Sequence, residues 1–169
     1  MVLGIISDTH GNRALMHDVV NRLEQELGAQ VIYHLGDDYD DAQELVDFAH
    51  EVRAVPGLWC PQYHDSRIPK RLFDTWGGVT VAACHADKDL TAKERAAAVV
   101  LTGHTHEPLL EKIGRSFYVN PGHLKGGTSR GSDSTFATVN ICDDAVRGAL
   151  HELDGSVRSE LTVSRAELA

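Results

Sequence analysis

Short apolar runs that end in a polar cluster recur along the first two thirds of the chain. An apolar run of three to six residues that is closed by glycine and polar residues is typical of a buried strand, which delivers side chains to one edge of a sheet. Because open α/β sheets bind ligands at the carboxyl ends of their strands, the pattern predicts a ligand site at that edge. The five runs lie at 2–6, 31–35, 79–83, 99–102 and 117–119.

Helices are predicted between several of these strands, where apolar residues recur at helical spacing. The clearest pattern runs from Leu15 to Leu23, and Gly28 supplies its stop signal. Segment 61–76 is polar and mixed, and it predicts a turn followed by a short helix. The predicted helices are Asn12–Leu27, Asp40–Glu51, Thr91–Ala97 and a short one near Pro69–Trp76.

The last third of the chain is predicted to be mostly strand. A hairpin is expected around Gly114-Arg115, and the glycine-rich segment Lys125–Ser134 predicts a mobile loop. Alternating strands and helices followed by strands alone favour an α/β sandwich with a mixed or second sheet over a simple doubly wound fold. The predicted strands are 2–7, 31–35, 52–55, 79–84, 98–102, 109–113, 116–119, 135–141 and 145–152.

Length and composition indicate one globular domain over residues 1–169, with a core over 1–152 and a C-terminal tail over 153–169. The chain is 42% hydrophobic, and a chain of this length buries roughly two thirds or more of its unfolded surface. No apolar stretch approaches the ~18–20 residues of a membrane span. The first apolar run meets Asp8 within a few residues, as a strand does and a signal peptide does not.

The cysteines and the net charge indicate the cellular compartment and the classes of partner to expect. Cys60, Cys84 and Cys142 are odd in number and far apart, which argues against a disulfide scaffold and favours the reducing cytoplasm. The net charge of −9 argues against binding of nucleic-acid backbone over the whole surface and does not favour an anionic membrane. A small phosphorylated substrate fits, because bound divalent cations would invert the local potential. Homo-oligomer formation is left open.

The first candidate metal ligands are carboxylates and an imidazole at the ends of the first two strands. Asp8 and His10 are two residues apart, so in an extended segment both point to one side and reach one ion. The alternative makes Asp8 a helix N-cap and His10 a loop residue. Asp37 follows a fully apolar strand, where an unpaired anion is costly but a carboxylate between two cations is not. Helix capping is a better role for the acidic residues just after it, Asp38, Asp40 and Asp41.

Histidines after two later strands complete the candidate set. His104 and His106 share one side of an extended segment beside Gly103, which favours metal binding over a structural role. His85 follows another apolar strand and becomes a candidate once the others are accepted. His123 lies after Asn120-Pro121-Gly122 and is not assigned to the site. The other histidines are interpreted as surface or packing residues: His17, His34, His50, His64 and His151.

These motifs together resemble a known family. Ser7-Asp8-Thr9-His10-Gly11-Asn12, Gly36-Asp37, the isolated His85, Gly103-His104-Thr105-His106 and Asn120-Pro121-Gly122 are similar, in order and spacing, to the calcineurin-like metallophosphoesterases and to their small prokaryotic YfcE-like branch. The resemblance covers residues 1 to about 152. It implies a four-layer α/β/β/α sandwich of two β-sheets flanked by helices. It also implies hydrolysis of phosphomonoesters or phosphodiesters.

The resemblance implies a site for two divalent metal ions, of the kind formed by Mn, Zn, Fe or Ni. By motif, Asp8, His10 and His106 would hold the first ion, and His85 and His104 the second. Asp37 would bridge the two, and Asn12 would touch the substrate phosphate. Two cations about 3.5–4 Å apart can activate a hydroxide and stabilise the entering and leaving oxygens of an in-line displacement. The expected function is therefore a metal-dependent phosphodiesterase or phosphatase.

One segment departs from the family pattern. The family places an Asn on the second metal where this chain has Leu58, and a histidine that assists the leaving group where it has Trp59. Cys60, Gln62 or His64 are the nearby replacements, and a thiolate would favour Zn or Fe over Mg. The alternative function is a catalytically weakened metal-binding or scaffold protein on the same fold, like the retromer subunit that resembles these enzymes. Retention of six of the seven usual ligands favours the enzyme.

Overall fold

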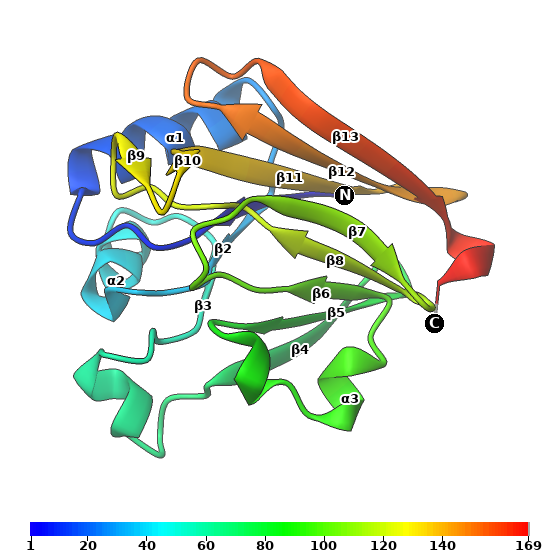
Figure 1. The fold of residues 1–169 in the computed structure, drawn as a ribbon, viewed down its shortest axis with the longest axis horizontal. Helices are drawn as coiled ribbons and strands as arrows, with labels where there is room; N and C mark the ends of the chain where they lie inside the picture. Colours follow the sequence, from blue (N-terminus) through cyan, green and yellow to red (C-terminus); the bar gives the residue numbers. More distant parts are fainter. Residues whose placement is uncertain (169) are drawn as a thin grey trace.

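The computed structural model describes residues 1–168, and its two large β-sheets pack against each other (Figure 1). The first sheet has six strands in the order β13-β12-β11-β1-β2-β3. Its strands β1, β2 and β3 are parallel, whereas β11, β12 and β13 follow antiparallel. The strands are β1 (Val2–Ile6), β2 (Val31–His34), β3 (Val52–Ala54), β11 (Thr135–Ile141), β12 (Ala145–Glu152) and β13 (Val157–Ser164).

The second sheet has five strands in the order β4-β5-β6-β8-β7. Strands β5, β6 and β8 are parallel, and β4 and β7 close the two edges as antiparallel partners. A two-stranded hairpin lies apart from both sheets. The strands of the second sheet are β4 (Arg71–Trp76), β5 (Val79–Cys84), β6 (Val99–Leu101), β7 (Leu109–Ile113) and β8 (Ser116–Asn120), and those of the hairpin are β9 (Thr128–Ser129) and β10 (Ser132–Asp133).

The core has one layer between the sheets and one beneath each outer face. Alternate residues of facing strands, such as Leu3, Val99 and Phe117, fill the space between the sheets. Helix α1 (Arg13–Gln25) buries an apolar stripe that includes Met16 and Leu23 against the first sheet. A smaller group covers the second sheet. Helices α2 (Tyr39–Asp47) and α3 (Ala92–Arg95) and the 3₁₀ turns Pro61–His64, Asp87–Asp89 and Arg165–Glu167 complete the elements.

The predicted α/β sandwich of two sheets is confirmed, with a thin outer layer because α3 is one turn long. The helix predicted near Pro69–Trp76 is wrong. That segment is β4, whose residues alternate between exposed and half-buried as an edge strand requires. The predicted tail over 153–169 contains β13, which pairs with β12 and buries Val163. Leu168 also joins the core between the sheets.

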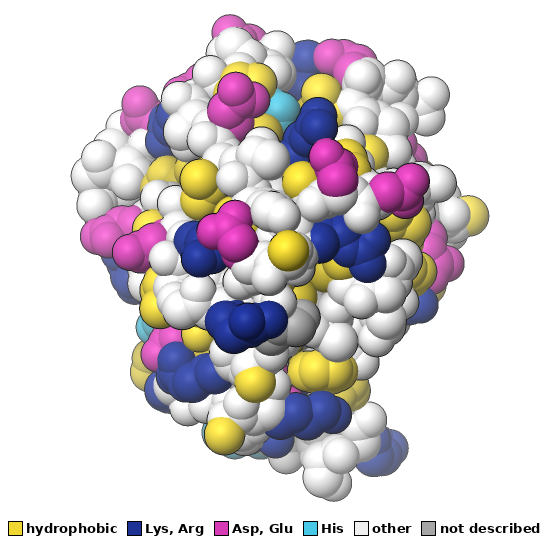
Figure 2. Space-filling view, turned by 90° about the vertical axis from the view of Figure 1, so that its right-hand side faces the viewer, with side chains coloured by type: hydrophobic (Ala, Val, Ile, Leu, Met, Phe, Trp, Pro, Cys, Tyr) yellow, Lys and Arg dark blue, Asp and Glu magenta, His cyan; other side chains and the backbone are white. Residues whose placement is uncertain are grey.

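The strand directions place the predicted ligand loops together. The carboxyl ends of β1, β2, β5 and β6 all point toward the left of Figure 1, the side on which α1 begins. Figure 2 shows the opposite end of the sandwich, where Lys and Arg side chains gather in the lower half of the face despite the net charge of −9. Over residues 1–168, no helix is long and apolar enough to cross a membrane.

Candidate metal centre

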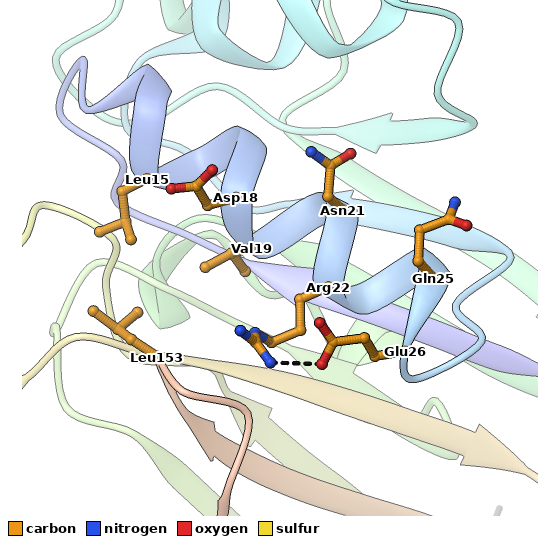
Figure 3. Close-up of a pocket in the computed structure, with 8 residues that line it drawn as sticks. All are labelled: Leu15, Asp18, Val19, Asn21, Arg22, Gln25, Glu26 and Leu153. Atoms are coloured by element: carbon orange, nitrogen blue, oxygen red, sulfur yellow. Dashed lines mark hydrogen bonds and ion pairs between the residues drawn. The ribbon is translucent and has the colours of Figure 1, made fainter.

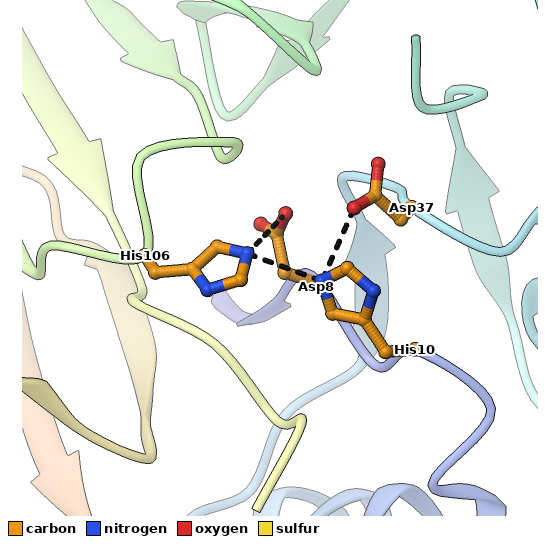
Figure 4. Close-up of side chains that lie close together, drawn as sticks. All are labelled: Asp8, His10, Asp37 and His106. Carbon is orange, nitrogen blue, oxygen red and sulfur yellow. Dashed lines mark hydrogen bonds and ion pairs between the residues drawn. The ribbon is translucent and has the colours of Figure 1, made fainter. Parts of the chain in front are cut away.

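Four of the predicted ligands converge where the two sheets meet (Figure 4). One ligand atom from each of Asp8, His10, Asp37 and His106 lies within 4.8 Å of every other. Nε2 of His106 lies 3.3 Å from Oδ1 of Asp8 and 3.1 Å from Nε2 of His10. Nε2 of His10 in turn lies 3.2 Å from Oδ2 of Asp37. Segments nearly 100 residues apart thus direct two carboxylates and two imidazoles at one point.

The remaining two predicted ligands lie on the other side of Asp37. Nε2 of His85 is 3.1 Å from Oδ1 of Asp37, and the rings of His85 and His104 are 5.0 Å apart between centroids. Asp37 therefore has one carboxylate oxygen toward His10 and the other toward His85. A carboxylate shared in this way is suited to lie between two cations.

Unpartnered buried atoms show that the centre fits a cation. Oδ1 of Asp8, Oδ1 of Asp37 and Nε2 of His85 are buried and have no hydrogen-bond partner, although Nε2 of His85 lies 3.1 Å from Oδ1 of Asp37. Buried polar atoms are normally hydrogen-bonded, and a buried carboxylate without a partner is costly. Carboxylate and imidazole together are a donor set for divalent ions such as Zn²⁺ or Mn²⁺. Cations bound on the two sides of Asp37 would satisfy all three atoms.

Hydrogen bonds behind the ligands fix their orientation. Nδ1 of His85 donates to the carbonyl of Leu35 at 2.6 Å, and Nδ1 of His106 lies 2.8 Å from the hydroxyl of Ser129. Oδ2 of Asp8 accepts the backbone N–H of His104 at 2.9 Å. These partners hold Nε2 of each imidazole and Oδ1 of Asp8 toward the centre, as outer partners of metal ligands do.

A buried carboxylate on α2 holds the loop after β1. Oδ2 of Asp41 accepts the hydroxyl of Thr9 at 2.6 Å and the backbone N–H of Gly11 at 3.1 Å, while Oδ1 pairs with Arg13 at 2.9 Å. Asp41 is 1% exposed. Asp38 occupies the N-cap position of α2, but its side chain makes no capping hydrogen bond, and Asp40 and Asp41 lie in the first turn. Sequence reasoning missed this function of Asp41, because no local pattern distinguishes it from a cap.

The hairpin β9–β10 packs beside the ligand loops, where a mobile loop over Lys125–Ser134 was expected. Ser129 contacts His106, and the guanidinium of Arg130 donates to the carbonyl of His104 at 3.0 Å. The side chain of Asn12 donates to the carbonyl of Lys125 at 3.2 Å. The segment is therefore tied to the loops after β1 and β6.

Charges around Asp37 shift the pKa values of its neighbours. Burial disfavours the ionised carboxyl of Asp37, but the adjacent His85 and His10 outweigh burial and lower its pKa. Burial also disfavours the imidazolium of His85, and attraction to Asp37 outweighs it and raises the His85 pKa. Burial and repulsion from His85 lower the pKa of His104. A cation entering the centre would meet an ionised Asp37 and would compete with protons for the imidazole of His85.

The backbone of the ligand loops is left-handed rather than extended. The φ angles are +53° at Asp8, +48° at His10, +68° at His104 and +64° at His106. The argument that each pair points to one side of an extended segment is therefore wrong, although Asp8 and His10 do meet. Non-glycine residues with positive φ cost of order 1–3 kcal/mol each and concentrate at functional sites.

Comparison with known proteins identifies the family. Residues 1–144 match the calcineurin-like phosphoesterase superfamily domain. The chain belongs to this superfamily. No curated protein matches the sequence significantly.

Solved structures share the fold at low sequence identity. Escherichia coli YfcE, a phosphoesterase, is 23% identical over 95% of this chain and 98% of its own, with a TM-score of 0.71. An archaeal phosphodiesterase is 18% identical over 96% of this chain and 100% of its own, with a TM-score of 0.67. Entamoeba histolytica Vps29 complexed with Zn²⁺ is 21% identical over 98% and 99%, with a TM-score of 0.68.

The segment that departs from the family pattern supplies no evident substitute ligand. The thiol of Cys60 donates to the backbone carbonyl of Asp37, and burial raises its pKa, which disfavours the thiolate. The amide of Gln62 donates to Asp40 at 2.9 Å. His64 is exposed and packs its ring edge against Tyr63. Leu58 is half-buried. The thiol of Cys60 and the amide N–H of Gln62 are thus engaged elsewhere, and His64 lies at the surface.

Asn12 and His123 both lie close to the centre. Asn12 is the N-cap of α1, where its side chain accepts the backbone N–H of Leu15. His123 is fully buried, with its ring centroid 5.0 Å from that of His106. Its Nε2 lies 3.0 Å from the carbonyl of Ser132, so it supports the ligand cluster from behind rather than joining it.

A cavity of about 390 Å³ lies away from the ligands, between α1 and the turn after β12 (Figure 3). Its wall includes the exposed ion pair between Arg22 and Glu26 and the side chain of Leu153. None of the predicted site residues lines it. This cavity is therefore separate from the candidate metal centre.

Proposed function

We propose that this protein is a metal-dependent phosphoesterase that hydrolyses phosphodiesters or phosphomonoesters. The observation that carries the proposal is the convergence of Asp8, His10, Asp37 and His106, with buried unpartnered atoms, in a chain of the phosphoesterase superfamily. A carboxylate–imidazole cluster with unfilled bonding capacity is suited to bind cations, and cations are what phosphoryl transfer requires. A solely structural cluster would satisfy its own hydrogen bonds.

The residues would divide the work as their geometry suggests. Asp8, His10 and His106 would hold one ion and His85 and His104 another, with Asp37 between them. Divalent ions bound here would activate the attacking water and neutralise charge on the phosphate oxygens. Ser129 and the carbonyl of Leu35 would keep the imidazoles aligned. The second amide N–H of Asn12, beyond the one given to Lys125, would be directed at the phosphate.

A second candidate is a metal-binding scaffold. It is favoured by the similarity to Vps29 and by Leu58 at the position of a family ligand. The six remaining ligand residues favour the enzyme, because a site freed from catalysis has no need to keep unpartnered buried groups.

The test is hydrolysis of p-nitrophenyl phosphate and bis(p-nitrophenyl) phosphate by protein purified without chelator, with metal content measured in parallel. We expect hydrolysis that is lost on chelation and restored by divalent metal. His106→Ala and Asp8→Ala should each lower turnover by ~100-fold or more with the fold intact, since misplacing reacting groups alone can cost that much. His50→Ala, at a histidine that pairs with Glu24 away from the centre, is the matched control.

Three results would decide between the candidates. Full activity after chelation would reject the metal-dependent reaction. Near wild-type turnover of either ligand variant at saturating metal would reject the assignment of that residue. Stoichiometric metal without hydrolysis of any ester in a broad panel would favour the scaffold.

A further inference from the structure

A second cavity, of about 220 Å³, lies beside the ligand loops. Its lining residues Gly11 and Asp38 directly follow the ligands His10 and Asp37, and the thiol of Cys60, which also lines it, donates to the backbone carbonyl of Asp37. A molecule whose phosphate lies at the metal centre would therefore extend into this cavity. Its remaining lining residues include Asp40, Trp59 and Gln62.

The cavity carries uncompensated negative charge. Its one cation, Arg13, pairs with Asp41 at 2.9 Å and also with Glu44. Asp38 and Asp40 belong to no ion pair among residues 1–168, and Asp40 accepts only the amide of Gln62. Two carboxylates that repel each other beside an open cavity gain most from a positively charged occupant.

The cavity also exposes the indole of Trp59. Trp59 is 86% exposed, more than any other large apolar residue described. Tryptophan is normally well buried, so an isolated exposed ring beside a cavity is informative. The face of an indole attracts cations, and an aromatic face beside carboxylates is how proteins recognise substituted ammonium groups. The aromatic and the acidic sides of the cavity thus favour the same chemistry.

We propose that this cavity binds the ammonium group of an amino alcohol esterified to the phosphate, so that the substrate is a zwitterionic phosphodiester. The phosphate would lie at the metal centre, and the ammonium against Trp59, Asp38 and Asp40. The amino alcohol is the group that stays on phosphorus while the other ester bond is cleaved. This inference rests on the proposed phosphoesterase function and names its substrate class.

Other occupants fit less well. A second phosphate or carboxylate would be repelled by Asp38 and Asp40. A neutral nucleobase could stack on Trp59, but it would leave both carboxylates uncompensated. A nucleobase is therefore a less favourable occupant of this cavity than an ammonium group, and the experiment below distinguishes the two.

The test compares two diesters that differ in charge alone. p-Nitrophenyl phosphorylcholine carries a trimethylammonium group, and p-nitrophenyl 3,3-dimethylbutyl phosphate is its neutral carbon isostere, with the same leaving group. We expect kcat/KM to favour the choline ester by roughly tenfold, from a cation–π contact and partly screened ion pairs. The preference should shrink as salt is raised. Thymidine 5′-(p-nitrophenyl) phosphate tests for a nucleobase.

Substitutions in the cavity show which residues cause the preference for the choline ester. Trp59→Ala and Asp40→Asn should each reduce the choline-to-isostere ratio by about threefold or more, and Trp59→Phe should retain part of it. Asp143→Asn removes an exposed carboxylate in the turn between β11 and β12, and should leave the ratio unchanged. Phosphatidylcholine vesicles beside soluble glycerophosphocholine show whether the ester is taken from a membrane surface or from solution.

A binding measurement tests the cation site independently of phosphoesterase activity. Titration with choline or 3,3-dimethylbutanol, followed by tryptophan fluorescence and repeated on Trp59→Phe, needs no turnover. Selective quenching by choline without hydrolysis of any ester would reject the phosphoesterase and keep the cation site. Equal hydrolysis of both diesters, or a preference for the thymidine ester that depends on Trp59, would overturn the cation site.

Discussion

The hydroxyl of Thr9 donates a 2.6 Å hydrogen bond to Oδ2 of Asp41, which joins the ligand loop after β1 to the first turn of α2. The same oxygen accepts the backbone N–H of Gly11, so the residues on either side of His10 are held by one buried carboxylate. Asp41, which is not among the predicted ligands, therefore helps to fix the position of the ligand His10.

Replacement of Asp41 should therefore affect metal binding as well as folding. Asp41→Asn keeps the shape but weakens the bonds to Thr9 and Arg13. We expect a 10–100-fold loss of metal affinity and a loss of about 1–3 kcal/mol in the free energy of unfolding. Calorimetric metal titration and denaturant unfolding measure the two effects. Asp47→Asn, at the exposed end of the same helix, is the control, and equal effects of both substitutions would contradict the prediction.

Ser129→Ala tests the contact between the β9–β10 hairpin and the centre. The substitution removes the hydrogen-bond partner of Nδ1 of His106, so the imidazole loses its fixed orientation. Metal affinity, measured by competition with a chromogenic chelator, should fall 10–100-fold with little change in melting temperature. Thr128→Ala alters the same hairpin without touching His106. Wild-type affinity in Ser129→Ala would show that the hairpin does not orient this ligand.

The two metal positions should differ in affinity. Asp8, His10, Asp37 and His106 offer four protein ligands to the first ion, whereas Asp37, His85 and His104 offer three to the second. Leu58 cannot replace the amide, and the thiol of Cys60 is directed at a backbone carbonyl. A titration should give one tight and one weaker event. Two equally tight events would mean that another group completes the second position.

The free energy of unfolding should fall at mildly acidic pH because of His34. His34 is fully buried below the ligand loop, and burial lowers its pKa to about 4. In the unfolded chain His34 has the ordinary pKa of 6.5. Below that pH the unfolded chain therefore binds a proton at His34, whereas the folded chain keeps this imidazole neutral. The stability due to neutral His34 is complete above pH ~6.5 and is lost as pH falls toward 4.

Denaturant unfolding of metal-free protein between pH 7 and pH 4.5 measures this effect. The wild type should lose about 1.4 kcal/mol per pH unit more than His34→Gln over the lower part of this range. Comparison of the two proteins cancels the contribution of the other histidines. Parallel pH profiles would show that His34 is not the responsible group.

Hydrolysis should depend strongly on the leaving group. General acid assistance is typically worth 10²–10⁴-fold, and the indole N–H of Trp59 cannot supply a proton near neutral pH. His123 is buried with Nε2 beside the carbonyl of Ser132, so it is held away from this role. A plot of log rate against leaving-group pKa should have a steep negative slope. A flat plot would point to an acid, with the exposed His64 as the first candidate.

Sequence predicted the positions of the ligand loops because each follows a short buried strand, and strand direction alone brings such loops together. The pattern could not predict the edge strand β4 as firmly. Leu72, Asp74 and Trp76 share its half-buried face, but an aspartate on that face and the adjacent apolar pair Leu72-Phe73 break the polar–apolar alternation, and only pairing with β5 makes this mixed segment a strand. The roles of Asp41 and Ser129 could not be predicted, because they depend on contacts with residues 32 and 23 positions away.

The local backbone of the ligand loops was also beyond prediction. Spacing of two residues suggested extended segments, whereas Asp8, His10, His104 and His106 all adopt positive φ. The glycines beside them, Gly11 and Gly103, were visible signals of tight turns. They do not reveal that the ligands themselves take the strained conformation.

This left-handed backbone sets a trade-off between stability and function. Glycine adopts positive φ without strain, and Asn and Asp tolerate it better than β-branched residues do. Replacement of His10 or His104 by Gly would thus relieve backbone strain while removing a ligand, and the variant would gain stability as it lost metal. A lineage released from catalysis is expected to drift toward Gly, Asn or Asp at these positions rather than toward Val or Ile. Gly, Asn or Asp at these positions in a relative without activity would then indicate that its loops kept the left-handed backbone after the metal ligands were lost.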